Sequence, residues 1–129
     1  MTPHDPERED DLTIRQQGDV TVVRFNTDNL LGMRDAQFMN DRLRALVIGP
    51  TQARKLVIDF ARVRFAGSST LGIVLALHRT MQEHGGRLVL AAADAILPLL
   101  KLAKADAIVT IAPSAGAAIG ILNDPPGDD

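Results

Sequence analysis

Two short apolar runs, each followed by apolar residues at helical spacing, constrain the fold of this chain more than any other feature. The runs KLVIDF (55–60) and RLVLA (87–91) are continuous rather than alternating, which is typical of strands buried on both faces of a sheet. The helical sets are Leu71, Val74, Leu75, His78 and Met81 after the first run, and Ile96, Leu99, Leu100 and Ala103 after the second. Strands that alternate with helices in this way predict right-handed crossovers and a mainly parallel sheet.

The remaining segments extend the alternation in both directions. Residues 12–16 and 20–25 are strand-like, and Gly18-Asp19 between them predicts the turn of an antiparallel hairpin. The other expected features are a helix from Arg34 to Gly49-Pro50, a helix stop at His84 and Gly85-Gly86, a helix capped by Asp94 with Pro98 in its first turn, a strand over 107–111, and a last helix over 113–122 that starts at Pro113. The predicted fold class is therefore α/β, a mainly parallel mixed sheet with an N-terminal hairpin, in the order β-β-α-β-α-β-α-β-α.

Composition narrows the chemistry that the chain can support. Its 129 residues suit one domain, 46% of them are hydrophobic, and with four Phe and no Trp or Tyr the core must be aliphatic. There is no cysteine, which excludes disulfides, thiolate zinc sites and Cys nucleophiles.

Charge is distributed unevenly along the chain. Five acids against Arg8 give residues 1–11 a charge of −4, and three acids give residues 123–129 a charge of −3. Because the whole chain has a net charge of −2, residues 12–122 carry a charge of +5. We expect the two ends to be acidic disordered tails around one domain at 12–122. Single, scattered cations without aromatic neighbours argue against nucleic-acid binding. Because nothing resembles a signal peptide or a membrane span, we expect a cytoplasmic protein with no direct membrane insertion.

The stretch RFAGSSTLGI (64–73) places two serines and a threonine at the front of an apolar run. A serine nucleophile would need a base, but His4 lies in a tail, and His78 and His84 lie too far along the same predicted helix. The stretch also lacks a nucleophile elbow and a P-loop lysine, and no His/Asp/Glu cluster suggests a metal. We therefore predict no enzyme activity, no catalytic residues, no metal and no cofactor.

Two compatible interpretations of the hydroxyls remain. Ser68 or Ser69 can be a helix N-cap, with its oxygen accepting a hydrogen bond from a backbone N–H. A serine there can also carry a phosphate, which would face the positive end of the helix dipole and leave the fold intact.

The span from LVIDF to KLA, about residues 56–103, resembles the STAS domain, specifically the anti-sigma factor antagonist family. The family's strand ending in Asp, its Phe-x-Asp-Ser-Ser-Gly-Leu-Gly helix start and its later Gly-Gly-Arg-Leu correspond here to Asp59, Phe65, Ser68-Ser69, Leu71-Gly72 and residues 85–88. The element order extends the resemblance to residues 12–122. Gly67 replaces the acid before the serines, and Thr70 replaces the glycine after them.

The resemblance implies a phosphorylation switch at Ser69, with Ser68 and Thr70 as lesser candidates. The implied partners are an anti-sigma factor that is also a serine kinase, and a phosphatase that restores the serine. The implied partner-binding residues are Asp59, Arg62, Arg64, Phe65, Gly67, Ser68, Ser69, Thr70 and Gly72.

Other interpretations stay open. Asp59 can brace the loop after its strand, Gly72 can allow close packing of a helix on the sheet, and His78 can be a half-buried structural residue. The protein can also be a STAS scaffold subunit of a larger complex without a phospho-switch (a stressosome or the partner of a lipid transporter), or a nucleotide sensor. Oligomeric state is not determined by the sequence.

Overall fold

The computed structural model describes residues 12–26, 29–30, 33–48, 53–92 and 95–123. The two predicted acidic tails lie outside these residues, except that Asn123 is the last residue of a helix. Within the described ranges, no helix is long and apolar enough to cross a bilayer.

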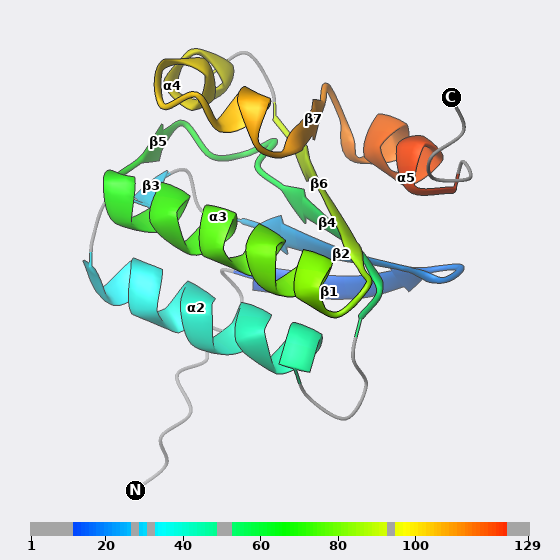
Figure 1. The fold of residues 1–129 in the computed structure, drawn as a ribbon. Coiled ribbons are helices and arrows are strands. Elements are labelled where there is room, and N and C mark those ends of the chain that lie inside the picture. The colour runs from blue at the N-terminus through cyan, green and yellow to red at the C-terminus, as the bar shows by residue number, and fades with distance from the viewer. Residues whose placement is uncertain (1–11, 27–28, 31–32, 49–52, 93–94, 124–129) are drawn as a thin grey trace, which may run out of the picture.

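A five-stranded mixed sheet forms the centre of the molecule, with the spatial order β1-β2-β4-β6-β7 (Figure 1). Strands β1 (Leu12–Gln17) and β2 (Val20–Phe25) pair antiparallel. Strands β4 (Lys55–Asp59), β6 (Arg87–Ala91) and β7 (Thr110–Ala112) add in parallel, beginning with the pairing of β4 to β2. The predicted fold class and the antiparallel hairpin are thus confirmed.

The hairpin turn has the chemistry that its sequence predicts. Gly18 has a φ of 65°, in the left-handed region that glycine adopts without a steric cost. The next residue, Asp19, accepts a 2.9 Å salt bridge from Lys55 Nζ at the start of β4. That contact lowers the pKa of the exposed Asp19 carboxyl, so the turn and the central strand are joined by a surface ion pair.

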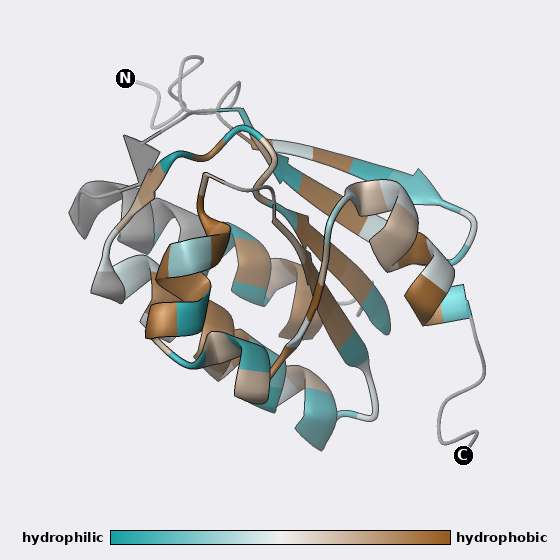
Figure 2. Cartoon of the chain, turned by 90° about the horizontal axis from the view of Figure 1, so that it is seen from above, coloured by the Kyte–Doolittle hydropathy of each residue, from teal (hydrophilic) through white to brown (hydrophobic). Residues whose placement is uncertain are grey.

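Helices cover both faces of the sheet. Helices α2 (Met33–Ile48), α3 (Ser68–Glu83) and α4 (Leu97–Leu102) contribute buried residues to one cluster, together with one face of the strands. Helix α5 (Ala115–Asn123) packs on the opposite face against the valines and alanines of the strands. Figure 2 shows the hydrophobic central strands enclosed between these layers.

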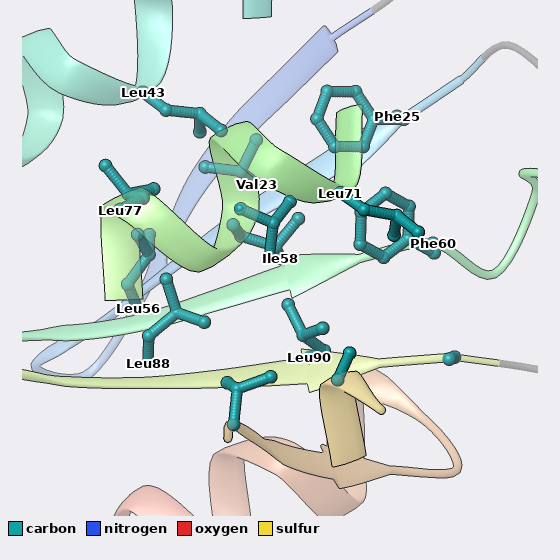
Figure 3. Close-up of a cluster of buried hydrophobic side chains, with 14 of the residues drawn as sticks. Val23, Phe25, Leu43, Leu56, Ile58, Phe60, Leu71, Leu77, Leu88 and Leu90 are labelled. Atoms are coloured by element: carbon teal, nitrogen blue, oxygen red, sulfur yellow. The ribbon is translucent and has the colours of Figure 1, made fainter. Parts of the chain in front are cut away.

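The larger cluster is aliphatic, as predicted, apart from one pair of rings. Figure 3 shows its leucines, isoleucine and valine meeting between the sheet and α3. The rings of Phe25 and Phe60 stack at 5.4 Å between centroids. Both phenylalanines lie at or just beyond the carboxyl ends of neighbouring strands, so the core extends to the edge from which the loop before α3 emerges.

Helix α3 ends where the two glycines predict. His84 is the C-cap, Gly85 adopts a left-handed φ of 78°, and Gly86 N–H donates to the Met81 carbonyl at 2.7 Å. Along α3, Leu71, Val74 and Met81 are buried as expected, and His78 is half-buried. Leu77 is also buried, which the sequence pattern did not single out.

The last third differs from the prediction in its boundaries. Helix α4 begins at Leu97 with Ile96 as N-cap, and Asp94, the predicted cap, lies outside the described residues. Pro98 lies in the first turn of α4, as predicted.

The last strand and last helix also start later than predicted. A 3-10 helix, η1 (Ala105–Ala107), occupies the start of the predicted strand, and β7 begins only at Thr110. Val109 N–H donates to the Ala105 carbonyl at 2.9 Å, so the backbone stays helical up to Val109, whose side chain is buried in the core. The strand can therefore begin only after this residue. Helix α5 begins at Ala115 because Ser114 Oγ accepts from Ala117 N–H at 3.1 Å, and Pro113 precedes this cap.

Replacing Leu90 with Ala should test the importance of this core. Leu90 is fully buried in β6, between β4 and β7, so the cavity should lower the free energy of unfolding by about 2–5 kcal/mol. Urea denaturation measures the change. Leu102→Ala is the matched control, because its side chain is 81% exposed and its loss should change stability by less than about 0.5 kcal/mol. Equal effects of the two substitutions would contradict the assigned core.

Candidate functional site

The loop between β4 and α3 starts with a buried carboxylate. Asp59 ends β4 and is only 4% exposed. Its Oδ1 accepts a hydrogen bond from Ala61 N–H at 2.8 Å, and Val63 N–H donates to the Phe60 carbonyl at 2.9 Å. Asp59 therefore braces the loop after its strand, as one interpretation of the sequence has it, and its side chain is buried.

Arg24 balances the charge of this carboxylate. The two residues are register partners on β2 and β4, and Arg24 Nε lies 4.0 Å from Asp59 Oδ2. Arg24 Nε is buried without a hydrogen-bond partner in the described part of the chain, so its contribution there is the attraction to Asp59. A buried acid that is paired and hydrogen-bonded is a structural group.

A two-stranded ribbon positions the next part of the loop. Strands β3 (Asn29–Leu30) and β5 (Phe65–Ala66) pair in parallel, so a segment before α2 holds the residues just before α3 (Figure 1). Sequence reasoning missed this pair, because two residues are too few to produce a periodic signal. Within β5, Ala66 is buried, whereas Phe65 is 55% exposed.

The N-cap of α3 is Gly67, not one of the serines. Gly67 has an extended backbone, with φ −91° and ψ 174°, and its carbonyl accepts from Leu71 N–H at 3.2 Å. The expectation that Ser68 or Ser69 caps the helix through its side chain is wrong, since both already lie inside the first turn. There, the N–H groups that precede the first intrahelical bond give the helix end its partial positive charge.

Successive residues of this first turn point in different directions. Ser69 is exposed, whereas Thr70, one residue later, is 1% exposed and has an internal polar partner. A helix rotates by about 100° per residue, which places the first hydroxyl toward solvent and the second toward the sheet. The Ser68 side chain lies outside the described part. Of the two described hydroxyls, Ser69 is the one that an enzyme can reach.

Gly72 lies one turn after Ser69 on the outer side of α3. It is exposed, and a Cβ built on it would meet nothing within 4 Å. The expectation that Gly72 allows close packing on the sheet is wrong. Ala76, one further turn along, is also exposed, so the outer side of the helix after Ser69 is nearly smooth.

We call the exposed residues of this region the Ser69 surface: Arg62, Arg64, Phe65, Ser69 and Gly72. Residues 60–72 contain no acid, and Asp59 just before them is buried next to Arg24. The surface therefore combines two cations, an exposed aromatic ring and the positive end of a helix. Gly67, the remaining predicted partner residue, is half-buried at its edge.

In the part of the chain that the structure describes, no histidine lies where it could act as a base for Ser69. His78 lies nine residues further along the same helix, which is about 14 Å at 1.5 Å per residue. His84 follows the last turn and has its Nδ1 2.9 Å from the Thr80 carbonyl oxygen. Among the described residues, no three His, Asp or Glu side chains are grouped where they could hold a metal ion.

Comparison with known proteins gives a family and a fold. The family model described as "Mlab, STAS domain" matches residues 12–110. No curated protein matches the chain significantly.

Several solved structures share the fold at low sequence identity. An anti-sigma factor antagonist from Mycobacterium paratuberculosis is 23% identical, with a TM-score of 0.75 over 88% of this chain and 93% of that one. An anti-sigma factor antagonist (STAS) domain protein from Planctomyces limnophilus is 20% identical, with a TM-score of 0.74 over 86% and 96%. The Bacillus cell fate determinant SpoIIAA in its phosphorylated form is 16% identical, with a TM-score of 0.65 over 87% and 99%.

Substitutions at Asp59 should show that it holds the loop. Asp59→Ala leaves Ala61 N–H without its acceptor and Arg24 without its ion-pair partner, so the free energy of unfolding should fall by about 1–3 kcal/mol. Asp59→Asn keeps an acceptor oxygen and should cost less. Chemical denaturation measures both, with the exposed Asp106→Ala as control. A loss at Asp59 no larger than at Asp106 would contradict the assigned role.

Gly72→Ala should stabilise the protein. The added methyl group meets open space, and alanine removes backbone entropy from a helix interior, so the gain should be about 0.5–1 kcal/mol. Thermal and urea unfolding measure it. Gly85→Ala is the control with the opposite sign: alanine at its φ of 78° should cost about 1 kcal/mol. Destabilisation by Gly72→Ala would mean that the outer side of α3 is covered.

Proposed function

This chain belongs to the STAS domain family, and from that premise we propose that it is an anti-sigma factor antagonist switched by phosphorylation of Ser69. In this role it is a non-enzymatic cytoplasmic regulator. Its unphosphorylated form binds a serine kinase that also acts as an anti-sigma factor, and thereby releases a sigma factor. A phosphatase returns the phosphorylated form to the binding state.

One observation carries the choice of residue. Ser69 is exposed in the first turn of α3, whereas Thr70 beside it is buried with an internal partner. Thr70 therefore does not compete as an acceptor, although the sequence makes it a candidate. In the transfer, Ser69 Oγ bonds to the γ-phosphorus of ATP on the kinase, the bond to ADP breaks, and the hydroxyl proton passes to a base of the kinase.

The surroundings of Ser69 suit a reversible modification. A phosphate brings about −1.5 to −2 charges, and the helix N-terminus stabilises such charge by about 0.3–1 kcal/mol. The stretch 60–72 contains Arg62 and Arg64 and no acid. Phosphorylation should thus leave the fold intact and act on the partner.

The partner would lose affinity because the phosphate must be desolvated at the interface. Phe65, which is 55% exposed, would be the apolar anchor of the partner, and the exposed Gly72 on the outer side of α3 leaves room for close approach. A dianion placed between these contacts would cost a few kcal/mol, on the order of 100-fold or more in affinity.

Two of the structural neighbours support the proposal by their own descriptions. The structure from Mycobacterium paratuberculosis is of an anti-sigma factor antagonist, and SpoIIAA has been solved in a phosphorylated form. Gly67, where the family has an acid, is one of the two departures of this chain from the family pattern, and Thr70 is the other. The glycine removes a contact for the kinase, so specificity at this site must come from other exposed residues, such as Arg62 and Phe65.

A second function is favoured by the family model itself, which is described by the name Mlab rather than as an antagonist. In that case the chain is a STAS subunit of a larger complex, such as a stressosome or a lipid-transporter assembly. The same Ser69 surface would then be a permanent contact without a phosphate.

Incubating the protein with its cognate kinase and ATP, followed by mass spectrometry, tests the switch. We expect one phosphate at Ser69, no phosphate on Ser69→Ala, and normal labelling of Thr110→Val, which removes an exposed hydroxyl of β7. The phosphorylated protein should bind the kinase at least tenfold more weakly than the unmodified one.

Binding without ATP separates the two functions. In one outcome, the protein forms a complex with the kinase in the absence of ATP and yet receives no phosphate at residues 68–70 when ATP is added. That result would overturn the phosphorylation switch but support the kinase as a binding partner. Stable co-purification with a larger assembly, unaffected by Ser69→Ala and without a kinase, would replace the proposal with the scaffold function.

A further inference from the structure

The first strand begins at the end of the sheet that carries the Ser69 surface. Leu12, the first residue of β1, is the register partner of Phe25 at the end of β2. Arg24, just before Phe25, is in turn the partner of Asp59 at the end of β4. Neighbouring strands lie about 4.8 Å apart, so Leu12 is about 10 Å from the point where the β4–α3 loop begins. The β1–β2 turn lies at the opposite end of the sheet (Figure 1).

Contacts on both sides of its backbone fix the start of β1 in this position. Leu12 is 4% exposed and belongs to the same buried cluster as Val63 and Ala66, which anchor the loop before α3. Asn26 Nδ2 donates to Thr13 Oγ1 at 2.6 Å, which joins the start of β1 to the residue after β2. The chain therefore reaches β1 beside the Ser69 surface.

The segment that leads into β1 and the Ser69 surface have opposite charges. Residues 5–11 hold five acids and one cation, a net charge of −4, and three of the acids immediately precede Leu12. On the surface, Arg62 and Arg64 are both exposed, and residues 60–72 contain no acid. The first turn of α3 adds the partial positive charge of a helix N-terminus. Segment and surface are therefore complementary in charge.

The acidic segment is also long enough to reach the two arginines. Arg62 is three residues past Asp59, so its backbone is at most about 20 Å from Leu12, and Arg64 follows two residues later. Residues 5–11 span about 23 Å when extended.

The two cations of the hairpin are less suitable targets for these acids. Arg24 lies 4.0 Å from the buried Asp59 carboxylate, which already balances its charge. Arg15 is three residues from Leu12 along β1, and because side chains alternate along a strand it lies on the other face of the sheet. Arg62 and Arg64 are on the loop that Leu12 adjoins.

We infer that residues 5–11 dock through their acids on Arg62 and Arg64 and cover the Ser69 surface of the unmodified protein. The tether gives the segment a millimolar effective concentration, so weak exposed ion pairs suffice for partial occupancy. A phosphate on Ser69 brings about −1.5 to −2 charges to the same surface and would displace the segment. One consequence rests on the proposed function: the docked segment would compete with the kinase for this surface.

A single spin label tests the docking in the full chain, which has no cysteine of its own. A nitroxide is attached to Thr2→Cys, and the broadening of backbone amide signals is compared with that in an equally labelled variant carrying Glu7→Gln, Glu9→Gln, Asp10→Asn and Asp11→Asn. The tether is the same in both proteins, so we expect the signals of residues 61–72 to be broadened at least twofold more with the acids present. Signals of the β1–β2 turn should not differ. Sodium chloride at about 0.5 M should remove the difference, because it screens exposed charges.

Paired substitutions of the cations are the controls. Arg62→Gln with Arg64→Gln should abolish the difference, whereas Lys101→Gln with Lys104→Gln, which removes the same charge from another exposed region, should preserve it. Equal broadening with and without the acids would overturn the docking, as would a difference that survives the loss of both arginines. Broadening of an isotope-labelled protein by a separate spin-labelled copy would assign the contact to a second copy of the chain and overturn the intramolecular contact.

These measurements use no kinase, so they succeed or fail independently of the proposed switch at Ser69. With the kinase present, the variant without the four acids should bind at least twofold more tightly than the unmodified protein. Equal affinities, with docking observed, would overturn the competition with the kinase and leave the docking in place.

Discussion

Burial of the central strand β4 on both faces is the constraint on which the rest of the structure depends. Its apolar side chains pack into both hydrophobic clusters, and it is paired in parallel on both sides. A strand in this position has no solvent face, so helices must cover both sides of the sheet. The chain leaves the core at the carboxyl end of β4, and the hydrogen bond from Ala61 N–H to Asp59 stabilises the first turn of the loop that follows.

The direction of the loop after β4 decides which of its residues face solvent and form the Ser69 surface. Val63 and Ala66 are anchored in the core, and the residues between and around them are directed to solvent. Thr70 then faces inward and Ser69 outward within a single helical turn. The exposed Ser69 and the buried Thr70 are therefore adjacent in sequence but face opposite sides of the helix, so the proposed phosphate would add charge to the outer surface and not to the core.

Sequence by itself determined the α/β class, the parallel order, the hairpin and the position of the hydroxyl cluster, because hydrophobic periodicity and turn residues are local signals. It could not find the β3–β5 pair, the late start of β7 or the cap at Gly67, since two- and three-residue elements carry no period and are set by what packs against them. It also assigned Gly72 to a packed interface that is open. Only tertiary structure decided which of the adjacent Ser69 and Thr70 meets solvent, because the rotation of α3 is fixed by burial of Leu71, Val74 and Met81 rather than by any residue at the site.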